Sequence, residues 1–211
     1  MRWQDTPVTA GIALVTLVVS ALILLSGALP SLALGAGFVP LRLEGVALPA
    51  GLSIVAPVWL TPLAATLIHG GVFHVVFNLL MLLVAGSMLE RAIGGPATAF
   101  VYVVGAYAAA AGQFAFDPQS AAPMIGASGA TSAIIGAYAL LYGQRRAKPV
   151  GPFSADVVHV AWLAAAWIGV QLLVGASGSG GITVAIGAHI GGFLAGLALA
   201  RPALLWRYRR A

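Results

Sequence analysis

Six long apolar segments dominate this sequence and restrict what the chain can fold into. They cover about residues 8–29, 73–90, 96–115, 124–143, 157–175 and 184–205. A helix that spans the hydrocarbon core of a membrane needs roughly 20 mostly apolar residues. Only 7% of the residues are charged, whereas soluble domains carry about 25%. The sequence therefore predicts an all-α, multi-pass membrane protein in which residues 1–211 form one domain.

The longest connection, roughly residues 30–72, separates the first two predicted spans. It is rich in proline and amphipathic in patches such as "VPLRLEGVAL". A segment of this kind is typical of chain that lies in the membrane interface. We therefore expect a long outer loop between the first and second helices.

The positive charges lie in the loops and predict the orientation of the chain. If the N-terminus is cytoplasmic, nine of the ten Lys and Arg residues fall on the cytoplasmic side, and Arg42 alone falls outside. The nine are Arg2, Arg91, Arg145, Arg146, Lys148, Arg201, Arg207, Arg209 and Arg210. This bias follows the positive-inside rule, so we expect cytoplasmic termini, a bacterial inner (plasma) membrane and no nucleic-acid partner. The absence of cysteine excludes disulfides and thiolate metal sites.

Four polar side chains interrupt the apolar segments. His74 and Asn78 are four residues apart and share one helix face, Ser128 begins the fourth span, and His189 lies near the start of the sixth. The second, fourth and sixth spans cross the membrane in the same direction. Each polar residue is therefore expected roughly 5–10 Å below the same outer edge. Polar groups inside a membrane are costly and mark functional sites by default.

This set of side chains is suited to acyl transfer. Ser128 becomes a nucleophile when a base takes its proton, and His189 is the natural base. The Asn78 amide and a ring N–H of His74 can donate to the oxyanion. Because no Asp or Glu lies at this depth, the sequence predicts a Ser–His dyad and not a triad.

Glycines surround these residues at positions where close approach matters. Gly126 and Gly129 leave room for a substrate backbone beside Ser128. In the sixth span, Gly192 and Gly196 continue a stripe of small residues that begins at Ala188. Such stripes let membrane helices approach closely. We therefore expect the fourth and sixth spans to be in contact, which would bring His189 to Ser128.

Each motif also has a simpler interpretation. The glycines alone fit helix packing, and His74 with Asn78 alone fits an interhelical hydrogen-bond pair.

Three histidines at similar depth have no anionic ligand beside them, so we expect no metal and no cofactor. A small-solute transporter would need a polar lining that the inner halves of the spans do not provide. Glu90 and Arg91, which end the second span, are interpreted as a structural ion pair or cap.

Three sequence blocks, "HGGVFHVVFN", "GASGA" and "GAHIGGFLAG", together resemble the rhomboid family of intramembrane serine proteases. The resemblance covers residues 59–205 and implies a six-helix core with Ser128 as nucleophile and His189 as general base. It also implies that His74 and Asn78 stabilise the oxyanion. The remaining matches are Gly126 before the serine, Gly192 and Gly196 in the sixth span, the structural histidine His69, and Glu90 with Gly94 after the second span.

One departure concerns the residue four positions after Ser128. Relatives often carry Tyr or Phe there, packed against the catalytic histidine, whereas this chain has Ser132. Ser132 could bond a water near His189 or satisfy a backbone carbonyl. The orientation of His189 is therefore the open point of the predicted site.

The resemblance implies an intramembrane endopeptidase that cleaves transmembrane segments of membrane proteins near the outer leaflet. Substrates of this family are thought to pass between the second and fifth spans. The alternative within the family is an inactive relative that binds transmembrane helices without cutting them. The presence of Ser128, His189, His74 and Asn78 favours the protease.

Overall fold

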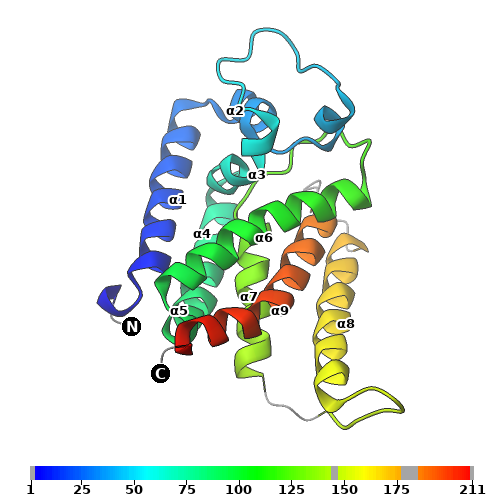
Figure 1. The fold of residues 1–211 in the computed structure, drawn as a ribbon. Helices are drawn as coiled ribbons and strands as arrows, with labels where there is room; N and C mark the ends of the chain where they lie inside the picture. Colours follow the sequence, from blue (N-terminus) through cyan, green and yellow to red (C-terminus); the bar gives the residue numbers. More distant parts are fainter. Residues whose placement is uncertain (1–2, 144–146, 177–184, 210–211) are drawn as a thin grey trace.

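The computed structural model describes residues 3–143, 147–176 and 185–209. Over these ranges the regular structure is helical, apart from isolated bridges such as Phe38 with Met124 (Figure 1). The helices are α1 (Pro7–Ser26), α2 (Leu29–Ala36), α3 (Thr61–Ala64), α4 (Val72–Met81), α5 (Ser87–Ile93), α6 (Gly95–Phe116), α7 (Ser128–Tyr142), α8 (Ala155–Ala176) and α9 (Ile186–Tyr208). The all-α prediction is confirmed.

Among the residues that the structure describes, five helical stretches are long and apolar enough to cross a membrane: Pro7–Ser26, Val72–Ile93, Gly95–Phe116, Ala155–Leu173 and Ile186–Tyr208. The second joins α4 to α5 through five π-helical residues, Leu82–Gly86. The remaining predicted span, 124–143, was placed too early, because α7 has only 15 residues and begins at Ser128. Met124 is paired with Phe38 (Met124 N to Phe38 O, 2.7 Å) and Gly126 has φ +108°. Neither residue can be the start of a helix in that arrangement.

The pairing of Phe38 with Met124 also ties the long outer loop to the segment before α7. The loop contains α2, α3 and short 3₁₀ turns at Pro40–Glu44, Val58–Leu60 and Ala65–Leu67. Phe38 and Ala65 are buried and pack with Ala110 of α6. Arg42 donates from Nη2 to the carbonyl oxygen of Ala56 (2.9 Å) and ties two parts of the loop together. The loop therefore folds partly into the protein and does not lie only along an interface.

Helix α7 is the centre of the fold. Its residues Ala130, Ala133, Ile134 and Ala137 are at most 1% exposed, and α6 and α9 pack along it (Figure 1). A helix enclosed in this way is shielded from lipid by its neighbours, so its 15 residues suffice. Five of the nine buried residues of α7 are Ala or Gly, which permits this close enclosure.

The contact between α7 and α9 is made backbone to backbone. A Cβ on Gly192 would overlap the carbonyl oxygen of Gly129, and a Cβ on Gly196 would overlap that of Ala133. On the other side of α7, a Cβ on Gly105 of α6 would overlap the side chain of Ala133. Small residues are what membrane helices use to approach this closely. The predicted role of Gly192 and Gly196 in packing agrees with these contacts.

Glu90 and Arg207 make hydrogen bonds between helices at the end of the molecule where α1 begins and α9 ends. The Glu90 carboxylate accepts from the backbone N–H groups of Val8 (3.0 Å) and Thr9 (2.7 Å) and from Thr9 Oγ1 (2.7 Å). A carboxylate in this position satisfies unpaired donors of the first turn of α1. The sequence left open whether Glu90 forms an ion pair or a cap, and in the structure its carboxylate caps the first turn of α1. Arg91 is exposed.

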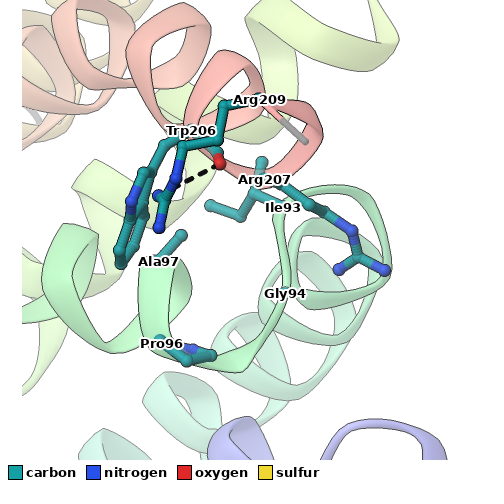
Figure 2. Close-up of a pocket in the computed structure, with 7 residues that line it drawn as sticks. All are labelled: Ile93, Gly94, Pro96, Ala97, Trp206, Arg207 and Arg209. Atoms are coloured by element: carbon teal, nitrogen blue, oxygen red, sulfur yellow. Dashed lines mark hydrogen bonds between the residues drawn. The ribbon is translucent and has the colours of Figure 1, made fainter. Parts of the chain in front are cut away.

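A pocket of about 260 Å³ opens beside this end. It is lined by Ile93, Gly94, Pro96, Ala97, Trp206, Arg207 and Arg209 (Figure 2). Arg209 donates to the carbonyl oxygen of Trp206 (3.3 Å), and Arg207 donates to that of Glu90 (3.4 Å). The pocket lies roughly 27 Å along α9 from His189, so it takes no part in the candidate site.

Substituting Gly196 with Ala is expected to destabilise the protein. The added Cβ overlaps the Ala133 carbonyl oxygen, and overpacking of this kind costs about 1–3 kcal/mol. The unfolding temperature in detergent should fall by roughly 2–12 °C. Gly11→Ala on α1 is the matched control, because nothing lies within 4 Å of its Cβ position. Its unfolding temperature should stay constant or rise. Equal effects of the two substitutions would contradict the backbone contact.

Candidate functional site

Ser128 and His189 face each other across the α7–α9 contact. Ser128 is the first residue of α7, and His189 lies in the first turn of α9. The distance from Ser128 Oγ to His189 Nε2 is 2.8 Å, which is a hydrogen bond of ordinary length. Ser128 also stands at the N-terminus of α7, where the first backbone N–H groups have no partner within the helix. A developing negative charge beside Ser128 would meet the positive end of α7.

Gly126 shapes the loop that leads into Ser128. Its φ of +108° is open to glycine and strained for other residues. A Cβ at this position would lie 2.7 Å from Nε2 and 2.8 Å from Cε1 of His74. The His74 ring therefore packs directly on the Gly126 backbone, two residues before Ser128. Gly126 is required both by its conformation and by this contact.

Hydrogen bonds assign the protonation of His74. Its Nδ1 accepts from the backbone N–H of Gly70 (3.2 Å), so a neutral ring carries its proton on Nε2. That N–H is the atom that faces Gly126. One turn further along α4, the Asn78 amide nitrogen donates to the carbonyl oxygen of His74 (2.9 Å), and Asn78 is buried. Its second amide N–H is available to another acceptor.

His69 connects three separate parts of the chain. Its Nε2 accepts from the backbone N–H of Ala127 (3.3 Å), and its Nδ1 lies 2.9 Å from Ser20 Oγ on α1. Ser20 in turn donates to the carbonyl oxygen of Leu67 (2.9 Å). Burial, reinforced by the nearby His74, lowers the pKa of His69 to about 4, so the ring is neutral near pH 7. The neutral ring holds the residue before Ser128 against α1.

Ser132 bonds to the backbone of its own helix and not to His189. Its Oγ donates to the carbonyl oxygen of Ser128 (2.8 Å), one turn back along α7. Of the two arrangements considered for this residue, the structure has the bond to a backbone carbonyl. Gly192 of α9 packs beside the Ser132 side chain, since a Cβ on Gly192 would lie 3.4 Å from Ser132 Cβ.

Two residues of α8 reach His189, and sequence reasoning missed both contacts. Gln171 Oε1 lies 2.7 Å from His189 Nδ1, and Trp167 Nε1 donates to the His189 carbonyl oxygen (3.1 Å). The Trp167 ring also stacks on Phe193 with 4.8 Å between centroids. Trp162, by contrast, is 69% exposed. The available signal was Gln171 itself, an amide within an apolar span.

The structure thus brings together residues from five helices and the loops before them. Ser128 contacts His189, and His74 contacts Gly126, while Gly129, Gly192 and Gly196 lie in the backbone contact between α7 and α9. Glu90 and Arg91 lie at the other end of the span that begins near His74. In the part of the chain that the structure describes, no three His, Cys, Asp or Glu side chains form a group that could hold a metal ion.

A multi-pass helical membrane protein with a hydrogen-bonded, half-buried Ser–His pair is the class that the fold and the site define. Comparison with known families identifies it further: a family model described as Rhomboid domain matches residues 57–206. The chain belongs to the rhomboid family. It is also similar to mouse rhomboid-related protein 2, with 40% identity over 72 residues, which is 34% of this chain and 23% of the mouse protein. The chain therefore aligns with less than a quarter of that relative.

Ser20→Ala is expected to destabilise the protein through His69. The substitution leaves the buried Nδ1–H of His69 and the Leu67 carbonyl without their partner. An unsatisfied buried polar group costs about 1–3 kcal/mol, so the unfolding temperature in detergent should fall by several degrees. Ser26→Ala, at the end of the same helix, removes only exposed or local bonds, to the Ile23 carbonyl oxygen and from the Ala28 N–H, and should change the unfolding temperature far less. A similar loss in both variants would contradict the bridging role of Ser20.

Proposed function

We propose that this protein is an intramembrane serine endopeptidase. The observation that carries the proposal is the 2.8 Å contact between Ser128 Oγ and His189 Nε2 at the adjoining ends of α7 and α9. Family membership supports it, because the resemblance to rhomboid proteases assigns the same two residues as nucleophile and base. No carboxylate is required for the step, since His189 alone can accept the proton.

The proposed reaction begins when His189 Nε2 takes the proton of Ser128. Oγ then attacks the substrate carbonyl carbon, and the carbonyl oxygen becomes an oxyanion. The Nε2–H of His74, the free amide N–H of Asn78 and the backbone N–H of Ser128 are the proposed donors to it. The His189 imidazolium next protonates the leaving amine. A water, deprotonated by the same ring, hydrolyses the acyl-serine and releases the second product.

The proposed substrates are transmembrane segments of other membrane proteins, cleaved near the outer leaflet. A cleavable peptide must be extended, so Gly or Pro in the substrate helix lowers the cost of opening it. Access between α4 and α8 fits the strongly exposed α4 side chains Phe73 (93%) and Phe77 (64%). We place the protein in a bacterial inner membrane with both termini cytoplasmic, on the distribution of its Lys and Arg residues.

The second candidate is a rhomboid-like protein that binds transmembrane helices without cutting them. A binding role makes no demand on a serine within hydrogen-bond distance of an imidazole, so the geometry favours the protease. The two candidates differ in their reaction with a fluorophosphonate, which forms a covalent bond only with an activated serine.

The wild-type protein, purified in detergent, is expected to be labelled by a fluorophosphonate and to cleave a model transmembrane substrate. Ser128→Ala should abolish both reactions, because the attacking oxygen is absent. Ser26→Ala, which removes a remote serine on α1, should retain them. Labelling that persists in Ser128→Ala, or a wild-type protein that neither labels nor cleaves, would favour the binding role.

Asn78→Ala is expected to lower kcat by roughly tenfold or more with little change in KM. This pattern follows if the amide donates mainly in the transition state. The measurement is a steady-state titration of a fluorogenic transmembrane substrate in detergent. An effect confined to KM would assign Asn78 to substrate binding and remove it from the proposed oxyanion site.

A further inference from the structure

Gln171 occupies an unusual place on α8. Only 11% of the α8 span is buried inside the protein, whereas Gln171 is 6% exposed. Its neighbours Leu172 and Leu173 are 52% and 73% exposed. The one amide of the α8 span therefore faces inward, and its oxygen lies 2.7 Å from His189 Nδ1. Intramembrane polar groups are retained where they bond to one another or serve the site.

This contact determines which nitrogen of His189 carries the proton. The Gln171 carbonyl oxygen has lone pairs and no hydrogen, so it accepts from Nδ1–H. A neutral His189 ring with its proton on Nδ1 has its free lone pair on Nε2. Nε2 is the atom 2.8 Å from Ser128 Oγ. The tautomer fixed by Gln171 is therefore the one that can take the serine proton.

Trp167 reinforces this arrangement from the same face of α8. It precedes Gln171 by one helical turn, and its indole N–H donates to the His189 carbonyl oxygen (3.1 Å). One residue of α8 thus holds the backbone of His189 and the other holds its ring. On α7, Ser132 is turned to the Ser128 carbonyl instead and contributes nothing to the ring.

We infer that Gln171 is a positioning residue that orients His189 as the base, an inference that rests on the proposed protease function. The amide oxygen does for the ring what a carboxylate does in a Ser–His–Asp triad, with a dipole in place of a charge. Its effect on the rate should therefore be smaller than the roughly 10⁴-fold effect of the triad carboxylate. Because Gln171 and His189 belong to different helices, the base is aligned only while α8 stays against α9.

The test compares three substitutions at Gln171 in the full-length protein in detergent. Gln171→Leu removes the acceptor at similar volume, and Gln171→Asn shortens the side chain and withdraws it. Both should lower kcat for a transmembrane substrate by about 10- to 100-fold, with KM changed less than threefold. Gln171→Glu keeps an acceptor at the same reach and should restore most of the activity. Leu172→Ala, next to it on the exposed face, is the control and should match the wild type.

The outcomes separate this inference from the proposed function. Ser128-dependent cleavage by the wild type, with normal kcat in both Gln171→Leu and Gln171→Asn, would overturn the role of Gln171 and leave the protease intact. Equal losses in the Leu, Asn and Glu variants would also overturn it, since they would indicate a packing role. If Gln171→Leu does not fold, Gln171→Asn against Gln171→Glu makes the same comparison. Absence of cleavage by the wild type would overturn both proposals.

Discussion

The backbone contact between α7 and α9 is the constraint on which the rest of the structure depends. Gly192 and Gly196 rest directly on the carbonyl oxygens of Gly129 and Ala133, so the two backbones touch at these points. Ser128 precedes Gly129, and His189 precedes Gly192 by less than one turn. Separation of the helices by one methyl group would lengthen the 2.8 Å bond between the two site residues. The packing motif and the chemical motif are therefore one arrangement, and neither can change alone.

The second constraint is the cost of polar groups in apolar surroundings. Each ring nitrogen described for His69 and His189 has a partner within 3.3 Å, and the partners include backbone N–H groups, hydroxyls and an amide. His74 is held through Nδ1 by Gly70, which leaves Nε2–H toward Gly126. Pairing of this kind avoids the penalty of a buried unsatisfied group. The same hydrogen bonds also fix the tautomers. They satisfy the buried ring nitrogens and decide which nitrogen of each ring carries the proton.

Much of this arrangement could be predicted from the sequence, because membrane helices follow from composition and shared depth follows from their direction. The spans, the all-α fold and the proximity of Ser128 to His189 were all accessible in this way. The start of α7 was not, because the pairing of Met124 with Phe38 joins residues 86 positions apart. The hydrogen-bond partner of Ser132 could not be predicted either. A hydroxyl inside a helix can serve its own backbone or a neighbour, and only the position of α9 decides between them.

Gln171 shows why a search for charged partners was too narrow. A triad is recognised by an acid beside the histidine, and the sequence has no Asp or Glu at the depth of His189. In apolar surroundings, however, an ionised carboxylate is far more costly to bury than an amide. An amide oxygen accepts the same Nδ1–H without that cost, and it gives up only the stabilisation of the imidazolium that a full charge supplies. The residue to look for was therefore a neutral acceptor on a neighbouring helix, which is the place of Gln171 on α8.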